Sequence, residues 1–367
     1  MHKIAFSWGL ILGGLTALGP LCTDFYLSAL PEITEQLQAT GTQTQLSLTS
    51  VLIGLGFGQL FWGPWSDRIG RRKPLVLSLL LFIFSSIMCA VTYDIYLLIV
   101  WRFLQGIAGA GGSVLSRSIA RDRYQGNLLI QFFSLLMIVN GIAPVLSPVL
   151  GGYIITVFNW RILFWMMAGI GVVLLILSLL VLHETRLVKS TEPGQSPGLS
   201  VLKNSCFMRY CLIQAFMMTG LFCYIGSSSF VMQREYGMTA MQFSLLFGLN
   251  GIGLIVSSLI FSKLIQRMAA EPLMRCGLLL AVLCAAVTLL FVCFRLPVFA
   301  LVSLFFTVSL IHGSQSGIAS ALMGTLMFVC GGIAVPLVGA GGESMVKMSL
   351  AIMISYVVAL FISYCKK

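Results

Sequence analysis

The sequence predicts an all-α protein that spans a membrane with twelve helices, arranged as two bundles of six. Of its 367 residues, 58% are hydrophobic and only 9% are charged, whereas soluble domains carry about 25% charged residues. The mean hydropathy is +1.00. The apolar residues lie in runs long enough to cross a bilayer, which takes about 20 residues per helix. Lysine and arginine are distributed unequally between the two sides that these runs define.

Twelve apolar runs are expected to span. They cover residues 4–21, 46–65, 74–92, 95–115, 128–149, 162–182, 207–231, 243–264, 273–294, 296–311, 318–338 and 348–364. The first run resembles the apolar part of a signal peptide, but no A-x-A-like cleavage site follows it, so we expect a retained helix.

The tenth run is unusually short. Residues 296–311 would form a helix of about 24 Å, against a hydrocarbon core of about 30 Å. We expect a shortened tenth helix that still crosses, because packing or local thinning of the bilayer can accommodate it. The eleventh helix would then be displaced at its cytoplasmic end.

The basic residues orient the chain. With a cytoplasmic N-terminus, seventeen of the 22 lysines and arginines lie on the cytoplasmic side, four lie on the opposite side, and Arg102 lies within a span. This agrees with the positive-inside rule. The net charge of +11 therefore reflects topology, and we expect no nucleic-acid partner.

The longest polar stretch divides the chain in two. We expect an N-terminal bundle over 1–183, a cytoplasmic linker over 184–206 and a C-terminal bundle over 207–367. Two halves of equal span number are typical of secondary transporters, whose substrate site lies at the midplane between them. The two halves match in span number and not in obvious motifs.

Enzymatic and metal chemistry find no support in the sequence. The ten cysteines occur singly and mostly in apolar runs, and the three histidines have no metal-ligand spacing. No nucleotide-binding loop or nucleophile motif is present. We therefore expect no enzymatic activity, no cofactor and no bound metal, and a monomeric protein whose partners are the bilayer, protons and a small drug-like molecule.

The segment between the second and third spans carries a specific spacing. It reads G-x-x-S-D-R-x-G-R-R-x-P, with Gly63, Asp67, Arg68, Gly70, Arg71 and Arg72 as its defining residues. Taken alone, the cations could mark an ordinary cytoplasmic loop. The full spacing resembles the signature loop of the major facilitator superfamily. The resemblance implies that Asp67 lies near the start of the eleventh helix and that Arg71 or Arg72 pairs with Asp122, which would close the cytoplasmic side.

The fourth span contains Arg102 in the pattern R-x-x-Q-G, followed by several glycines. An arginine in a membrane helix is costly and usually faces a cavity or a partner. The alternative is an arginine that extends to the outer interface. The pattern resembles the fourth-helix motif of the superfamily, in which this arginine is associated with proton coupling.

The fifth span contains two prolines, which remove backbone donors and favour a kink. Its motif residues are Gly141, Pro144, Pro148, Gly151 and Gly152. The segment resembles the motif that is typical of the superfamily's proton antiporters. Ser147 stands where that motif usually has glycine.

Asp24 follows the first apolar run in T-D-x-Y-L-x-A-L-P-x-I. If the helix continues to about Ala29, Asp24 lies within the membrane, where a carboxylate is a functional candidate by default. The alternative is an acid at the outer interface. The segment resembles the first helix of drug:proton antiporters of the bicyclomycin-resistance (Bcr/CflA) group. The resemblance is specific throughout the N-terminal half and weaker in the C-terminal half.

Polar or aromatic residues on otherwise apolar spans are candidates for lining the substrate cavity, although plain helix packing explains each equally well. They are Tyr26, Gln59, Trp62, Gln105, Asn140, Tyr153, Tyr224 and Asn250. Aromatic walls with few polar groups suit amphipathic ligands.

Together these features predict proton-coupled export of small amphipathic drugs or metabolites across a bacterial inner membrane. Asp24 is the expected proton-responsive carboxylate, and Arg102 is expected to stabilise its surroundings. A symporter or uniporter of a small metabolite is the alternative. The short tenth span also leaves open a family member that is impaired in transport.

The predicted topology can be tested with the native Cys365. Because we expect both termini in the cytoplasm, a membrane-impermeant thiol reagent should leave Cys365 unlabelled in intact cells and should label it in inverted vesicles. Labelling of Cys365 from outside intact cells would contradict the assigned orientation.

Overall fold

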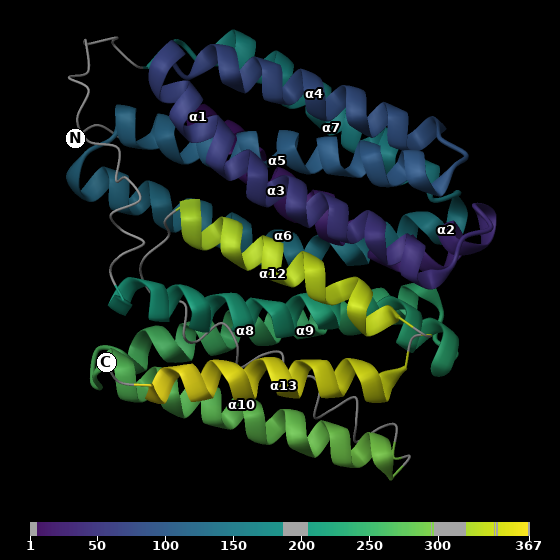
Figure 1. Ribbon diagram of the computed structural model, residues 1–367. Coiled ribbons are helices and arrows are strands. Elements are labelled where there is room, and N and C mark those ends of the chain that lie inside the picture. The colour runs from purple at the N-terminus through teal and green to yellow at the C-terminus, as the bar shows by residue number, and fades with distance from the viewer. Residues whose placement is uncertain are drawn as a thin grey trace.

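The computed structural model describes residues 6–185, 205–294, 296, 321–340, 342 and 344–365, and these residues form an all-α protein (Figure 1). No strand occurs in this part of the chain. The elements are α1 (Phe6–Asp24), η1 (Leu27–Ala29), α2 (Leu30–Gln36), α3 (Gly41–Ile69), α4 (Arg72–Val91), α5 (Ile95–Arg123), α6 (Gly126–Val157), α7 (Arg161–Val181), α8 (Ser205–Phe230), η3 (Val231–Glu235), α9 (Ala240–Leu264), α10 (Ala270–Cys293), α12 (Ala321–Gly339) and α13 (Met345–Tyr364). The predicted fold class is confirmed.

Most of the predicted spans coincide with these helices. Within the described residues, ten helices are long and apolar enough to cross a membrane, and α12 contributes the shorter apolar stretch Gly324–Gly339. The predicted tenth span at 296–311 lies outside the described residues except for its first residue, as does the linker between 186 and 204. The predicted domain limits remain a prediction.

The first helix extends beyond the predicted run of 4–21. The sequence allowed a helix that continues to about Ala29, whereas α1 ends at Asp24 and the chain reaches Gln36 through a turn, the short 3-10 helix η1 and α2. Pro31 explains part of this break, because proline has no N–H to donate to the carbonyl four residues earlier and clashes with it in a regular helix. Proline is well tolerated in the first turn of a new helix, which is its place in α2.

The helices run between two ends of the molecule. The first residue of α1 and the last residue of α13 lie at the same end, which we call the terminal face, and α2 lies at the other end, which we call the opposite face (Figure 1). The terminal face also holds the α3–α4 and α5–α6 connections. The described arginines of these connections therefore gather there, as expected for a cytoplasmic surface.

Two helix starts show the internal repeat that the sequence motifs did not. The second spans of the two halves, α3 and α9, each begin with a T-x-x-Q capping box. Thr40 caps α3 with Gln43, and Thr239 caps α9 with Gln242. In each box the hydroxyl accepts the backbone N–H of the third helical residue, and the glutamine accepts the N–H of the cap.

Small residues set the packing of the N-terminal helices around α5. A β-carbon on Gly54 would lie 2.3 Å from the Phe103 carbonyl oxygen, and one on Gly106 would lie 2.2 Å from the Val51 carbonyl oxygen. The backbones of α3 and α5 therefore touch, which small residues permit between membrane helices. Across the molecule, α3 packs against α12 and α6 packs against α9, and these two seams join the halves.

Replacing Gly106 with alanine should destabilise the protein by about 1–3 kcal/mol, because the new methyl group overpacks the α3–α5 contact. Gly169→Ala is the matched control, since a β-carbon there meets nothing within 4 Å. Thermal unfolding of the purified variants in one detergent measures the difference. Equal unfolding temperatures would contradict the packing argument.

Candidate functional site

Asp24 ends α1 inside the protein. Only 5% of its surface is exposed, which excludes the alternative of an acid at the outer interface. In the described residues, no lysine or arginine nitrogen lies within 4.0 Å of its carboxylate, and the Thr23 side chain is its hydrogen-bond partner. A buried carboxylate without a nearby cation is costly in its ionised form. Asp24 therefore has the surroundings expected of a carboxyl that changes protonation during a reaction cycle.

Arg102 points inward from α5 and is fully buried, so the alternative of an arginine that reaches the outer interface is wrong. Its guanidinium donates to the Cys22 carbonyl oxygen at 2.5 Å and to Gln105 Oε1 at 2.5 Å. It also lies over the Tyr26 ring, 4.0 Å from the centroid. Arg102 thus fixes the last turn of α1, two residues before Asp24, without forming an ion pair with it.

Gln105 extends this network to the next helix. It accepts the hydrogen bond from Arg102 and donates one to Ser86 Oγ of α4 at 2.7 Å. The R-x-x-Q spacing places both side chains on one face of α5. Gln105 therefore acts as the partner of Arg102 and is buried within the N-terminal helices.

The proline-containing helix α6 lies beside the break in α1. Pro144 and Pro148 lie within a helix that continues from Gly126 to Val157. A β-carbon on Gly151 would lie 2.0 Å from the Phe25 carbonyl oxygen, and one on Gly152 would lie 2.0 Å from Ser244 Oγ of α9. These glycines let α6 touch the broken segment on one side and the C-terminal half on the other. Gly141 faces Ile255 of α9 at ordinary contact distance.

The other cavity candidates do not form one group. Tyr26 bonds Ser47 Oγ at 3.3 Å, Trp62 donates to the Ile107 carbonyl oxygen at 2.7 Å, and Tyr224 bonds Asn250. Tyr153 is 61% exposed and Asn140 is also exposed, so neither joins these buried residues. Gln59 meets Gly324 of α12, where a β-carbon would collide with its amide.

The two best-formed hollows in the described residues are open surface grooves of about 440 and 360 Å³, lined by residues of α9 with Met238 and by residues of α4. Neither groove is lined by a predicted cavity residue. Residues 297–320 of the C-terminal half lie outside the described part of the chain, and a cavity shared by the candidates stays a prediction.

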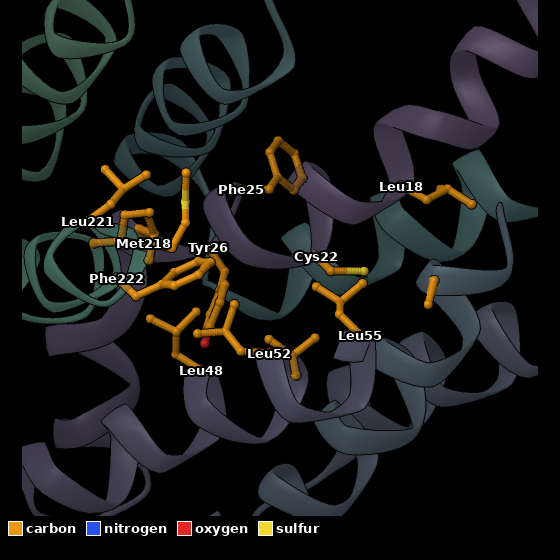
Figure 2. Close-up of a cluster of buried hydrophobic side chains, with 14 of the residues drawn as sticks. Leu18, Cys22, Phe25, Tyr26, Leu48, Leu52, Leu55, Met218, Leu221 and Phe222 are labelled. Carbon is orange, nitrogen blue, oxygen red and sulfur yellow. The ribbon is translucent and has the colours of Figure 1, made fainter. Parts of the chain in front are cut away.

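Sequence reasoning missed the apolar residues that meet between the halves. Figure 2 shows Tyr26, Leu48 and Leu52 facing Met218 and Phe222 of α8. All are buried, and together they form one hydrophobic cluster, which we call the central cluster. Leucine, methionine and phenylalanine on apolar helices give no signal that separates them from ordinary core residues.

The signature loop forms a compact polar cluster at the terminal face. Arg71 Nε donates to Asp122 Oδ2 at 2.8 Å, which is one of the two pairs expected, and its NH1 lies 2.8 Å from Asp67 Oδ1. Burial alone lowers the pKa of the Arg71 guanidinium, but the hydrogen bond and charge of Asp122, together with Asp67, outweigh it and raise this pKa. Arg71 therefore ties the end of α3 to the end of α5.

The remaining loop residues have distinct places. Gly70 has φ +94°, a left-handed conformation that favours glycine. Arg68 is exposed, Arg72 donates to the Leu179 carbonyl oxygen at 3.0 Å, and Gly63 faces Val114. The expected position of Asp67 near the start of the eleventh helix involves residues before 321, which lie outside the described part of the chain.

Glu184, to which the sequence motifs assigned no separate role, also contacts the signature loop. Its Oε1 accepts the Arg71 N–H at 2.8 Å, and its Oε2 accepts the Arg72 N–H at 3.1 Å. It therefore caps α4, and a negative charge at a helix N-terminus is favourable. Thr185 beside it bonds Asp122 Oδ2 at 3.4 Å. The residues that follow α7 thus hold the signature loop in place.

Glu184→Gln should lower the free energy of unfolding by about 1–3 kcal/mol, because an amide can accept only one of the two backbone N–H bonds and has no charge. The control is Glu35→Gln, where the side chain is 75% exposed and its closest cation lies at 4.0 Å. Unfolding of both variants at neutral pH provides the measurement. If both behave like the native protein, Glu184 is not the cap of α4.

Comparison with known proteins adds sequence similarity to this geometry. The profile of the Major Facilitator Superfamily matches residues 12–336. The chain is 38% identical to the uncharacterized MFS-type transporter YdgK of Bacillus subtilis (strain 168), over 97% of this chain and 94% of that protein. It is 29% identical to the bicyclomycin resistance protein homolog of Haemophilus influenzae, over 76% and 71% of the two chains. It is 32% identical to the multidrug resistance protein MdtL of Klebsiella pneumoniae (strain 342), over 63% and 59%.

Solved structures share the fold. The xylose transporter XylE from E. coli, in a partially occluded inward open conformation, has a TM-score of 0.77 and 15% identity, covering 97% of this chain and 96% of that one. A bacterial homolog of the lysosomal transporter Spinster, inward-facing and occupied, has a TM-score of 0.75 and 15% identity, covering 97% and 95%. At these identities the similarity concerns the fold alone.

Proposed function

Because the chain belongs to the major facilitator superfamily of membrane transporters, we propose that it exports small amphipathic molecules in exchange for protons. The proposal includes a bacterial inner membrane as its location, a cytoplasmic terminal face and a monomeric transporter. The names of the Haemophilus and Klebsiella relatives support drug-like substrates. The first-helix motif resembles that of Bcr/CflA drug:proton antiporters, and the fifth-helix motif resembles that of the superfamily's proton antiporters. Both support exchange in preference to symport.

One observation carries the proton part of this proposal: the buried Asp24 carboxylate lies at a break in a membrane helix, beside the seam between the halves. Deprotonation of Asp24 becomes favourable only when water or a cation can reach it. A movement that opens and closes the seam therefore changes the affinity of Asp24 for a proton. Arg102 of α5 holds the last turn of α1 by bonding the Cys22 carbonyl oxygen, so the Asp24 carboxyl keeps its place at the end of α1.

The central cluster supports the part of the proposal that concerns the substrate. Tyr26, Leu48 and Leu52 belong to the N-terminal half, and Met218 and Phe222 belong to the C-terminal half, so separation of the halves uncovers an apolar surface on both sides. Aromatic and methionine side chains adapt to varied apolar ligands. Tyr26 also touches Arg102, which places the substrate surface next to the group that fixes the Asp24 segment.

The cluster of Arg71, Asp122 and Glu184 supplies the cytoplasmic gate. Its hydrogen bonds join the ends of α3 and α5 and the start of α4 into one unit. Partly buried, charge-assisted pairs are strong enough to keep this unit together. The unit would move as one body when the terminal face opens.

Asp24→Asn should abolish proton-driven efflux while the protein stays folded, because asparagine fills the same volume and does not exchange a proton. Asp94→Asn is the control, since Asp94 caps α5 by accepting two backbone N–H groups and asparagine caps helices equally well. Substrate efflux and internal pH are measured together in proteoliposomes with an imposed proton gradient. Undiminished coupled efflux in Asp24→Asn would refute the assignment.

The substrate itself is identified by a susceptibility panel in a host that lacks its own efflux pumps. Expression of the native chain should raise tolerance to a set of amphipathic compounds, and expression of Asp24→Asn should not. Uptake of a metabolite with the proton, in place of export, would favour the symporter alternative.

A further inference from the structure

The break in α1 leaves backbone carbonyls that the C-terminal half satisfies. In a regular helix, the Leu27 carbonyl would accept the N–H of residue 31, but Pro31 has none, and the Leu30 N–H bonds this oxygen in the 3-10 turn. Ser229 Oγ of α8 donates to this carbonyl oxygen at 2.5 Å. Gln233 Nε2 donates to the next one, Ser28 O, at 3.0 Å. An element of one half therefore completes the backbone hydrogen bonding of the other.

These two donors form a directed chain. Gln233 uses one amide hydrogen for Ser28 O and the other for Ser229 Oγ at 2.9 Å, which leaves the Ser229 hydroxyl hydrogen for Leu27 O. Gln233 lies in η3, a π-helical turn at the end of α8. Such turns are rare and are found mostly at functional sites. Leu27, Ser28 and Ser229 are all buried, so no solvent competes for these bonds.

The segment whose carbonyls are held by these hydrogen bonds contains Asp24. Arg102 of the N-terminal half holds the Cys22 carbonyl oxygen before Asp24, and Ser229 and Gln233 of the C-terminal half hold the Leu27 and Ser28 carbonyl oxygens after it. The carboxyl is thus placed between an anchor in its own half and an anchor in the other half. Movement of the C-terminal half away from α1 must break the second anchor.

We propose that Gln233, acting through Ser229, is a positioning residue that holds the opposite face closed and couples its opening to the Asp24 segment. Opening this face removes the Ser229 and Gln233 donors, so water must replace them at Leu27 O and Ser28 O, although Leu27 O keeps its bond from the Leu30 N–H. Opening therefore admits water to the segment next to Asp24. The role of Gln233 in coupling rests on the proposed transport function. The anchor itself rests on the hydrogen bonds between the halves.

Other hydrogen bonds also join the halves, among them those from Thr42 Oγ1 to Gly339 O at 3.0 Å and from Gln45 Nε2 to Gly226 O at 3.3 Å, but neither of these involves the Asp24 segment. The charged contacts of the opposite face are weaker or lie within one half. Arg234 approaches Glu35 at 4.0 Å, with both side chains substantially exposed, and such pairs contribute little. Glu235 accepts the Met345 N–H, which lies in the C-terminal half. Glu35, Arg234 and Glu235 are the ionisable groups close to Gln233 in these elements, and none bonds Leu27 or Ser28 in the described structure.

Hydrogen exchange of the full chain in lipid nanodiscs tests the proposal. Gln233→Ala should speed amide exchange in residues 25–36 and 225–236 by about five- to tenfold, because the bond to Ser28 O between the halves and the bond that orients Ser229 are both lost. Gln242→Ala is the control, since Gln242 lies on the same face and its capping bonds stay within the C-terminal half. Unchanged exchange in Gln233→Ala, or an equal increase in Gln242→Ala, overturns the proposal.

A second variant separates this role from a general loss of stability. In Gln233→Glu, a protonated carboxyl can donate to Ser28 O, whereas an ionised one repels it. We expect native-like protection in acid and Gln233→Ala-like exchange in alkaline buffer, each compared with Gln233→Ala at the same pH so that intrinsic exchange cancels. The comparison is made in an Asp24→Asn background, which removes the response of that carboxyl. Protection that does not depend on pH overturns the proposal.

The hydrogen-exchange test of Gln233 and the efflux test of Asp24 can fail independently of each other. If Gln233→Ala opens the face while efflux does not depend on protons, Gln233 retains its structural role and the proposed function fails. If Asp24→Asn abolishes coupled efflux while Gln233→Ala exchanges like the native chain, the proposed function stands and Gln233 is not the anchor.

Discussion

A backbone carbonyl that has lost its partner inside a membrane protein must find another donor, because no water is present to replace it. The break in α1 creates this demand, and the functional groups of the structure are arranged around it. Arg102 donates to Cys22 O and Gln233 donates to Ser28 O, while Ser229 adds a second donor to Leu27 O beside the Leu30 N–H. The hydrogen bonding of one short segment therefore depends on both halves of the molecule. This dependence makes the segment sensitive to their relative position.

Close packing supports the same arrangement. Gly54 and Gly106 bring α3 against α5, which fixes the helix that carries Arg102. Gly151 lets α6 approach the Phe25 carbonyl, and Gly152 lets it approach α9. The motif glycines thus serve backbone contact on both sides of the break, and the prolines of α6 occur in a helix that stays continuous. Tight contacts of this kind transmit a displacement of one helix to its neighbours.

At the terminal face, the main described contacts are made by charged side chains. Arg71 is bonded to Asp122, and Glu184 caps α4 from the residues that follow α7. These bonds are partly exposed, so each contributes less than a buried contact and can break without unfolding the protein. The described contacts of the two faces therefore differ in kind. Neutral hydrogen bonds join the halves on the opposite face, whereas the contacts of Arg71, Asp122 and Glu184 on the terminal face lie within the N-terminal half.

The sequence by itself determined the fold class and most helices within the described residues, because apolar length is a local property. It indicated Asp24 and Arg102 as residues within spans, with an interfacial position open for each, and a resemblance indicated the pairing of Arg71 or Arg72 with Asp122. Only the tertiary structure decided that both side chains are buried, that α1 ends at Asp24, and that Tyr153 and Asn140 stay apart from the buried candidates. It also decided that Glu184 bonds the start of α4 and that Gln233 bonds Ser28 O. Those outcomes depend on which distant residue reaches a free carbonyl or N–H, and neither composition nor spacing along the chain contains that information.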